Sequence, residues 1–271
     1  MTAFVRPRPI DRPALRLVVF HHAGGSAAAY FPMTRSLPAD WDVLLLDLPG
    51  RGRRHSSPAL EDMAGLVARA FEDVLPWASS APLALFGHSL GAVVAYETAR
   101  SLEAGGVRPR WVGVSGRVAP GNRPPRLLPS HELPDQELMA GLTAMGGMHH
   151  RIDELPEFRE RFLRLVRSDL RAVAGYRPAP EPRPLAAPLT AFTATDDPWA
   201  PPESMAGWER VTRAAFRQRT FGGGHFHFLG AAFADFTEAV AEEIRHALAT
   251  TTTDRPARVP AQTPGHRSWR P

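Results

Sequence analysis

The sequence predicts an α/β fold in which a mostly parallel, doubly wound sheet carries an inserted helical lid. Short apolar, β-branched runs alternate with segments of helical periodicity along most of the chain, as in sheets whose parallel strands are joined by helices. The alternation stops between about residues 118 and 184, where only helical patterns occur. A chain of 271 residues can bury one large core. We therefore expect a single main domain over residues 15–249.

Five apolar runs are expected to form the parallel strands, because they are dominated by apolar residues and show no alternation with polar ones. They are LRLVVF at 15–20, DVLLLDL at 42–48, PLALFG at 82–87, WVGVSG at 111–116 and PLTAFTAT at 188–195. Helical patterns follow two of these runs, at 60–75 and 89–106. The second helical pattern ends in a Gly pair that suits a helix C-terminus.

Two amphipathic segments predict the lid, PDQELMAGLTAM at 134–145 and PEFRERFLRLVRSDLRAVAGY at 156–176. Each opens with Pro and acidic residues, which favour a helix N-terminus. Insertions at this point of an α/β fold lie over the carboxyl ends of the strands, where ligands bind. Met145, Phe158 and Phe162 are therefore candidates to line an acyl-sized cavity. Simple packing of the lid on the domain would explain the same apolar residues.

The composition excludes several kinds of chemistry. The chain has no cysteine and no lysine, and all 32 of its basic residues are arginine. Disulfides, thiolate metal sites, a cysteine nucleophile, Schiff-base catalysis and a serine/lysine dyad are excluded together. Any nucleophile in this protein must use oxygen.

The net charge of +4 is concentrated in the two ends of the chain. Residues 1–16 carry +3 and residues 250–271 another +3, which leaves −2 for the rest. We expect an N-terminal arm over 1–14 and a disordered tail over 250–271, and no nucleic-acid binding. One basic loop, LPGRGRRHSS at 48–57, would be either solvated or a phosphate contact.

No apolar run approaches the roughly 18 residues that span a bilayer. The first residues also lack the apolar segment of a secretory signal. We therefore expect no membrane association and a cytoplasmic location.

A GxSxG motif, formed by Gly87, Ser89 and Gly91, lies directly between a strand run and a helical segment. In that context the serine is expected on a sharp turn, where the two glycines remove Cβ atoms that would clash. Its hydroxyl would project at a helix N-terminus, whose dipole favours developing negative charge. This arrangement is typical of the α/β-hydrolase fold and makes Ser89 the candidate nucleophile. A Gly-rich turn with a capping serine is the structural alternative.

A serine nucleophile needs a base to take its proton and an acid to orient that base. In α/β hydrolases these follow in the order Ser, Asp, His. We expect the acid in TDDPWAP, where Asp197 precedes Pro201 by four residues and Asp196 is the alternative. The base is expected in TFGGGHFHFLG, where His225 follows the Gly run directly and His227 is the alternative.

The oxyanion of a tetrahedral intermediate also needs two backbone N–H donors. Leu90 is expected to supply one because it follows the nucleophile, and Ala23, in the loop HHAGGSAAAYF, is expected to supply the other. A strand-to-helix turn with Ser26 as N-cap would explain the glycines of this loop equally well. His22 is expected to have a structural, hydrogen-bonded role.

Five segments taken together, FHHAGGSAAAYF, LPGRGRR, FGHSLGA, TDDPWAP and GGGHFHFL, resemble the type II thioesterases that accompany modular polyketide synthases and nonribosomal peptide synthetases. The resemblance covers about residues 4–248. Two positions depart from the family pattern: His21 stands where Pro is common, and His227 where a second Phe is common. These departures concern the shape of the acyl pocket and the polarity beside His225.

The resemblance implies a serine hydrolase that removes acyl groups from the phosphopantetheine thiol of acyl or peptidyl carrier domains, which would be its partners. It places the triad roles on Ser89, Asp197 and His225 and implies no cofactor and no metal. Two alternatives remain open from the residues alone. One is a carboxylesterase or lipase that uses the same triad on oxygen esters, and the other is a non-catalytic binder of acyl ligands.

Overall fold

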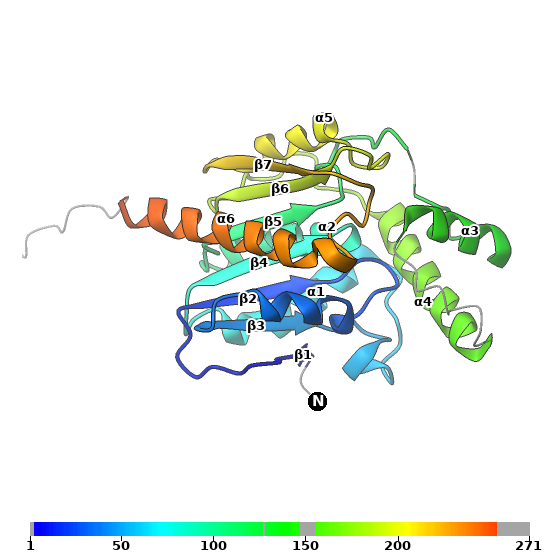
Figure 1. The fold of residues 1–271 in the computed structure, drawn as a ribbon, viewed down its shortest axis with the longest axis horizontal. Helices are drawn as coiled ribbons and strands as arrows, with labels where there is room; N and C mark the ends of the chain where they lie inside the picture. The colour runs from blue at the N-terminus through cyan, green and yellow to red at the C-terminus, as the bar shows by residue number, and fades with distance from the viewer. Residues whose placement is uncertain (1–2, 127, 147–155, 254–271) are drawn as a thin grey trace, which may run out of the picture.

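The computed structural model describes residues 3–126, 128–146 and 156–253. These residues form one seven-stranded sheet in the order β1-β3-β2-β4-β5-β6-β7 (Figure 1). The strands are β1 (Phe4–Val5), β2 (Leu15–Phe20), β3 (Trp41–Leu46), β4 (Leu83–His88), β5 (Trp111–Ser115), β6 (Leu189–Ala194) and β7 (Phe216–Phe221). All neighbouring strands are parallel except β1, which runs antiparallel to β3. The structure therefore confirms the predicted mostly parallel, doubly wound sheet.

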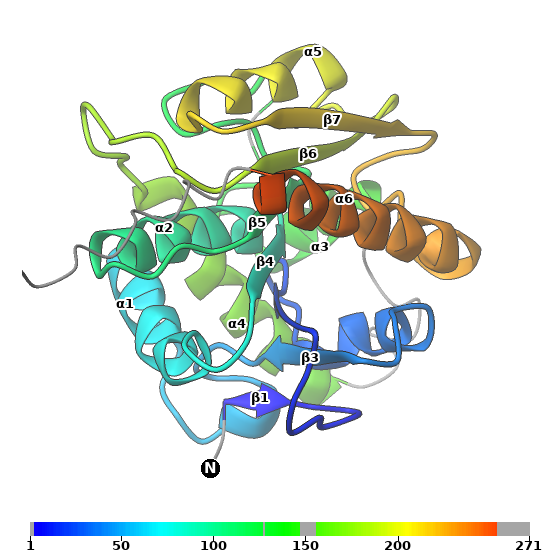
Figure 2. The same ribbon diagram turned by 90° about the vertical axis from the view of Figure 1, so that its left-hand side faces the viewer.

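Helices cover both faces of the sheet (Figure 2). The α1 helix (Met63–Val74) and the α2 helix (Leu90–Ala104) pack on one face, and the 3-10 segment η1 (Ala27–Arg35) and the α6 helix (Phe233–Thr253) pack on the other. Along β2, Val18 and Phe20 face the first pair while Leu17 and Val19 face the second. Because both faces are buried, the central strands are mostly apolar, as the runs predict. The charged residues Arg16 on β2 and Asp42 on β3 are buried as an ion pair with each other.

The lid consists of α3 (Asp135–Met145) and α4 (Pro156–Gly175), which lie together beyond one end of the sheet (Figure 1). Both helices fall where the sequence predicts them. They share a small apolar core of their own, formed by Leu138, Met139, Leu163, Val166 and Leu170. The short helix α5 (Pro202–Met205) and the 3-10 segments η2 (Gly52–Arg54), η3 (Leu75–Trp77), η5 (Ala206–Val211) and η6 (Gly230–Ala232) complete the described elements.

Two strands were not expected from the sequence. The β7 strand, FRQRTF, lies at an edge of the sheet, and its Arg217 and Arg219 pair with Glu243 on α6. Edge strands carry charged side chains that hide the apolar pattern of a buried strand. The β1 strand arises within the predicted N-terminal arm, where Arg6 donates two hydrogen bonds to the carboxylate of Asp42.

The C-terminal helix α6 continues to Thr253, four residues into the predicted tail, and residues 254–271 of that tail lie outside the described residues. Among the helices of the described ranges, none has the length and apolar character needed to cross a bilayer.

Candidate active site

Ser89 occupies the turn between β4 and α2 in a strained backbone conformation, with φ 55° and ψ −113°. Within the described part of the chain it is the one residue other than glycine with a positive φ. The motif glycines are required by close packing. A Cβ atom on Gly87 would lie 2.0 Å from the carbonyl oxygen of Gly91, and one on Gly91 would lie 2.2 Å from that of Phe20. The turn thus has the geometry that exposes a serine nucleophile above a sheet.

Asp197 and His225 meet at the carboxyl ends of β6 and β7. The Nδ1–H of His225 donates a hydrogen bond of 2.8 Å to Oδ2 of Asp197, and both side chains are buried. The opposite ring nitrogen, Nε2, is also buried and makes no hydrogen bond to any described residue. With its proton on Nδ1, the imidazole presents Nε2 as a free acceptor, which is the state a general base requires.

The second oxygen of the Asp197 carboxylate is held by the backbone. Its Oδ1 accepts the N–H groups of Trp199 at 2.9 Å and Ala200 at 3.3 Å. Burial acts to raise the pKa of Asp197, but the hydrogen bond from His225 and these two N–H groups outweigh it, and the net shift is downward. The carboxylate is therefore charged and oriented toward His225. The alternative acid, Asp196, is exposed to solvent.

The alternative base, His227, makes no side-chain hydrogen bond to the acid and stacks on the ring of Phe221, with 5.2 Å between centroids. Burial lowers its pKa to about 4, and neither of its ring nitrogens has a well-formed hydrogen bond. The structure thus pairs Asp197 with His225 and leaves both alternatives outside the pair.

Two further imidazoles adjoin the pair and are held neutral. The ring of His88 lies 4.8 Å from that of His225, and its Nδ1 forms a hydrogen bond with Oγ of Ser115. Burial, followed by the nearby His225, lowers the pKa of His88 well below its usual value. The same causes, in the same order, lower the pKa of His22 to about 3, and its Nδ1 forms a hydrogen bond with the Tyr30 hydroxyl. Near neutral pH neither ring carries a charge that would compete for Asp197.

The loop after β2 and the turn after β4 lie side by side because these two strands are neighbours, with Phe20 paired to Gly87. The direction of the strand order changes at this point of the sheet, which is where doubly wound sheets bind ligands. The N–H groups of Gly24 and Gly25 already donate to Asp169 and to the carbonyl of His22. We find no acceptor for the N–H of Ala23 among the residues that the structure describes.

Leu90 is the first residue of α2, so its N–H points out of the helix without an intrahelical acceptor. The two predicted oxyanion donors thus come from adjacent loops. Ser26, the alternative N-cap of η1, makes no side-chain capping bond, and the N–H of Ala27 donates instead to Asp47 at 2.8 Å.

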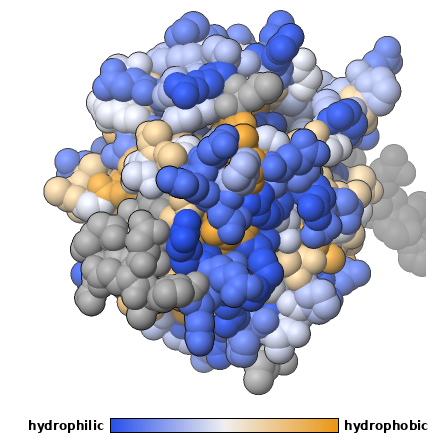
Figure 3. All heavy atoms as spheres, turned by 90° about the vertical axis from the view of Figure 1, so that its right-hand side faces the viewer, coloured by the Kyte–Doolittle hydropathy of each residue, from blue (hydrophilic) through white to orange (hydrophobic). Residues whose placement is uncertain are grey.

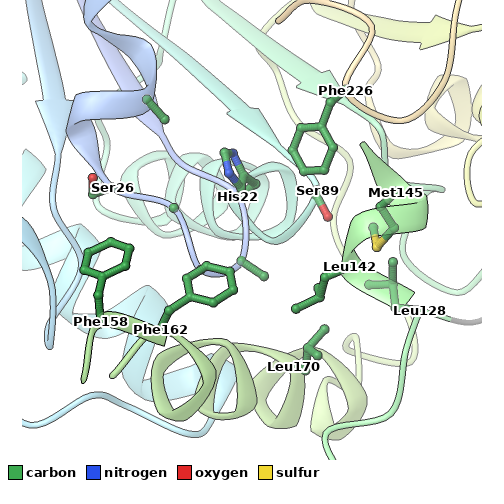
Figure 4. Close-up of a pocket in the computed structure, with 14 residues that line it drawn as sticks. His22, Ser26, Ser89, Leu128, Leu142, Met145, Phe158, Phe162, Leu170 and Phe226 are labelled. Carbon is green, nitrogen blue, oxygen red and sulfur yellow. The ribbon is translucent and has the colours of Figure 1, made fainter. Parts of the chain in front are cut away.

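A cavity of about 330 Å³ opens at Ser89 between the sheet and the lid. Its apolar wall comes mostly from the lid, and Figure 4 shows the Ser89 hydroxyl pointing into the space beside Leu142 and Met145. The apolar lining side chains are Leu128, Leu142, Met145, Phe158, Phe162, Leu170 and Phe226. On the lid end of the molecule, small apolar areas are visible among hydrophilic side chains (Figure 3). Met145, Phe158 and Phe162, the three lid residues singled out from the sequence, line this cavity.

Sequence reasoning missed part of this wall. Phe226 lies between His225 and His227 and faces the cavity from the base loop. The position of Phe226 is set by the turn that brings His225 over the sheet. This turn is irregular, so no periodic pattern in the sequence predicts where Phe226 points. Leu170, in contrast, continues the apolar face of α4 and could have been added by helical spacing from Phe162 and Val166.

Comparison with known proteins identifies the family of the domain. Residues 15–248 match the family model of the thioesterase domain. The chain belongs to the thioesterase family. This thioesterase is 39% identical over 223 residues to Thioesterase PikA5 of Streptomyces venezuelae, a match that covers 82% of this chain and 78% of the relative.

Solved structures of similar proteins agree with this assignment. The type II thioesterase BorB from the borrelidin biosynthetic cluster is 34% identical, with a TM-score of 0.76 over 89% of this chain and 96% of BorB. YbtT, a type II thioesterase from the yersiniabactin NRPS/PKS biosynthetic pathway, is 27% identical, with a TM-score of 0.79 over 91% of this chain and 99% of YbtT. The thioesterase described here is thus a serine hydrolase of the α/β-hydrolase type, as the sequence predicts.

Proposed function

We propose that this thioesterase hydrolyses acyl groups from the phosphopantetheine thioester of carrier domains, with Ser89 as nucleophile, His225 as general base and Asp197 as the orienting acid. The observation that carries the proposal is the state of His225. Its Nδ1 is engaged by a buried carboxylate, and its Nε2 is buried and makes no hydrogen bond to any described residue. The next residue, Phe226, lines the apolar cavity that reaches Ser89. The chain offers no thiol or amine nucleophile that could replace the serine.

In the first half-reaction, Oγ of Ser89 attacks the thioester carbonyl while Nε2 of His225 takes its proton. The N–H groups of Ala23 and Leu90 hold the resulting oxyanion. When the intermediate collapses, the carbon–sulfur bond breaks, and His225 returns the proton to the leaving sulfur. The products are an acyl ester on Ser89 and a free pantetheine thiol.

In the second half-reaction, water attacks the ester carbonyl and gives a proton to His225. The same two N–H groups hold the second oxyanion. Collapse breaks the bond between the acyl carbon and Oγ of Ser89, and the proton on His225 passes to that oxygen. The carboxylic acid leaves and the enzyme is restored.

Two features agree with an acyl thioester on a carrier domain as the substrate. The cavity wall is apolar and offers few polar groups beyond the loop after β2, which suits an acyl chain. YbtT is, by its description, a type II thioesterase from an NRPS/PKS biosynthetic pathway, and BorB is a type II thioesterase from a biosynthetic cluster. A cytoplasmic site of action belongs to the same proposal.

The test is incubation of the purified protein with a carrier domain that bears an acylated phosphopantetheine arm. Mass spectrometry of the arm should show loss of the acyl group by the wild type and no loss by Ser89→Ala. Rapid hydrolysis of simple oxygen esters with no loss of acyl group from the carrier would overturn the proposal. A fluorophosphonate probe provides a second measurement, because it labels an activated serine covalently. If the wild type stays unlabelled while it binds acyl ligands, the protein is a binder and the proposal fails.

A further inference from the structure

A buried ion pair connects the lid to the loop after β2. Asp169, in the C-terminal half of α4, is fully buried although it is charged, and its Oδ2 accepts the N–H of Gly24 at 2.7 Å. The guanidinium of Arg51 donates to both oxygens of the same carboxylate, from Nη1 to Oδ2 at 2.6 Å and from Nη2 to Oδ1 at 2.9 Å. One carboxylate therefore holds three chain segments that are far apart in the sequence.

Arg51 belongs to the basic loop at 48–57, for which the sequence allowed either a solvated loop or a contact with phosphate. Its side chain is 2% exposed, and its remaining hydrogen-bonding capacity is directed at the carbonyl of Pro49, at 3.3 Å from Nε and 3.2 Å from Nη2. Four hydrogen bonds from Arg51 are thus made to groups inside the protein. The basic loop supplies a buried partner for Asp169 rather than a surface for phosphate.

The α4 helix also packs directly on Gly24. This residue has a φ of +72°, and a Cβ atom on it would lie 2.5 Å from Cγ2 of Val166 and 3.0 Å from the ring of Phe162. The backbone of the loop is therefore pressed against the helix that carries Asp169. Asp47 anchors the loop at its other end, through the N–H of Ala27.

The bond to Gly24 orients the proposed oxyanion donor. The N–H of Gly24 and the carbonyl of Ala23 belong to one rigid peptide plane. Once Asp169 fixes that plane, the direction of the Ala23 N–H depends on the two backbone dihedral angles of Ala23 alone. A displacement of about 1 Å at a catalytic group costs on the order of 100-fold in rate.

Charge gives the pair a second effect. An unpaired carboxylate one residue from the oxyanion site would repel the negative charge that develops there. The bidentate guanidinium of Arg51 neutralises Asp169, so the carboxylate orients the loop without opposing the intermediate.

We propose that Asp169 and Arg51 are positioning residues for the oxyanion site: the lid carboxylate fixes the peptide plane next to the Ala23 N–H, and Arg51 cancels its charge. This inference rests on the proposed function and adds that α4 takes part in transition-state stabilisation. It assigns no direct contact with the substrate to either residue.

The test separates effects on the transition state from effects on the ground state. In Asp169→Asn the side chain keeps its size, and its single oxygen will stay with the donors at the Oδ2 position, Gly24 N–H and Nη1 of Arg51. Its NH2 group then meets Nη2 of Arg51, a donor against a donor, so the side chain must shift away from Arg51 and the Gly24 peptide plane that it holds shifts with it. An alkyl trifluoromethyl ketone, which adds to Ser89 and forms an oxyanion, reports on the oxyanion site. The matching alkyl thioether of pantetheine has no carbonyl and reports on cavity binding alone.

We expect Asp169→Asn to lower kcat on a short acyl-pantetheine thioester and to weaken ketone binding by the same factor, about 10- to 100-fold. The Kd of the thioether and the KM should change less than threefold. Arg51→Lys keeps the charge and loses the bidentate geometry, so it should lower the same two quantities in parallel by a smaller factor. If Asp169→Asn does not fold, Arg51→Lys tests the positioning role in its place.

Asp42→Asn is the matched control, because Asp42 is also a fully buried carboxylate, paired with Arg6 and Arg16 at the opposite end of the strands. It should lose stability while kcat stays within twofold of the wild type. The inference is overturned if Asp169→Asn and Arg51→Lys affect kcat no more than Asp42→Asn does, or if ketone and thioether binding weaken together. A wild type that fails to react with the ketone would instead refute the proposed function.

Discussion

Replacement of Asp197 by Asn tests how this carboxylate controls His225. In the structure, Oδ1 of Asp197 accepts two backbone N–H groups, from Trp199 and Ala200, and Oδ2 accepts the Nδ1–H of His225. An asparagine has a single oxygen, and the two fixed backbone donors will retain it. Its NH2 group must then face Nδ1 of His225, which becomes an acceptor.

This change moves the imidazole proton to the wrong nitrogen. With Nδ1 as acceptor, the neutral ring carries its proton on Nε2 and can no longer take the proton of Ser89. Loss of the correct tautomer in a serine triad costs about 10⁴-fold in kcat. We therefore expect kcat/KM to fall by about 10³- to 10⁴-fold, which corresponds to roughly 4 to 5.5 kcal/mol in the barrier.

The assay is release of the thiol from an acyl-pantetheine thioester, followed with a thiol-reactive dye. Because the chain contains no cysteine, the protein adds no background signal. The control is Asp196→Asn, which changes an exposed neighbour and should leave kcat/KM within about twofold of the wild type. Less than a tenfold loss in Asp197→Asn, or an equal loss in the two variants, would refute the reasoning from the Oδ1 contacts.

Two other predictions concern His227 and the cavity. His227→Phe removes a buried imidazole without well-formed hydrogen bonds, so it should raise Tm by about 2–4 °C at neutral pH. Because the pKa of His227 is about 4 in the fold, against 6.5 as its ordinary value, the unfolded chain binds the extra proton between these pH values. Wild-type stability should therefore fall as the pH falls from 6.5 to 4, and the advantage of His227→Phe in urea titrations should grow over that range; a constant difference would contradict this. Met145→Phe fills part of the cavity. For each methylene of the acyl chain that no longer fits in the cavity, kcat/KM should fall about fourfold. The measurement is kcat/KM for a series of thioesters of increasing acyl chain length. Phe31→Ala, at a 44% exposed residue that does not line the cavity, is its control, and an equal loss for short and long chains would argue against an acyl pocket.

The features that could be predicted from the sequence are the local ones. Ser89 can be predicted because the glycines that its turn requires stand only two positions away on either side, and the central strands because burial on both faces makes them mostly apolar. His225 and Asp197 come from different loops, and for each of them the sequence offered an alternative, His227 for the base and Asp196 for the acid. The hydrogen bond that selects this pair joins residues 28 positions apart and appears only once β6 and β7 are neighbours.

The ion pair between Arg51 and Asp169 could not be predicted, because its partners are 118 positions apart and neither occurs in a recognisable pattern. One signal was present. Asp169 lies on the same helical face as Val166 and Val173, where a charged residue interrupts an apolar stripe. A charge in that position must find a partner when the helix is buried, but the sequence does not reveal which of 32 basic residues supplies it.

The two halves of α4 make different contacts in the structure. Phe158, near the start of the helix, is 55% exposed at the edge of the cavity, and Phe162 follows one turn later. Substitutions there would alter which acyl chains fit while leaving the anchored half of the helix in place. Asp169, two turns further on, ties the helix to the loop that would carry the chemistry. New substrate preferences can therefore arise by changing the first half of α4, whereas a lid transplanted from a relative would have to bring a carboxylate that meets Arg51.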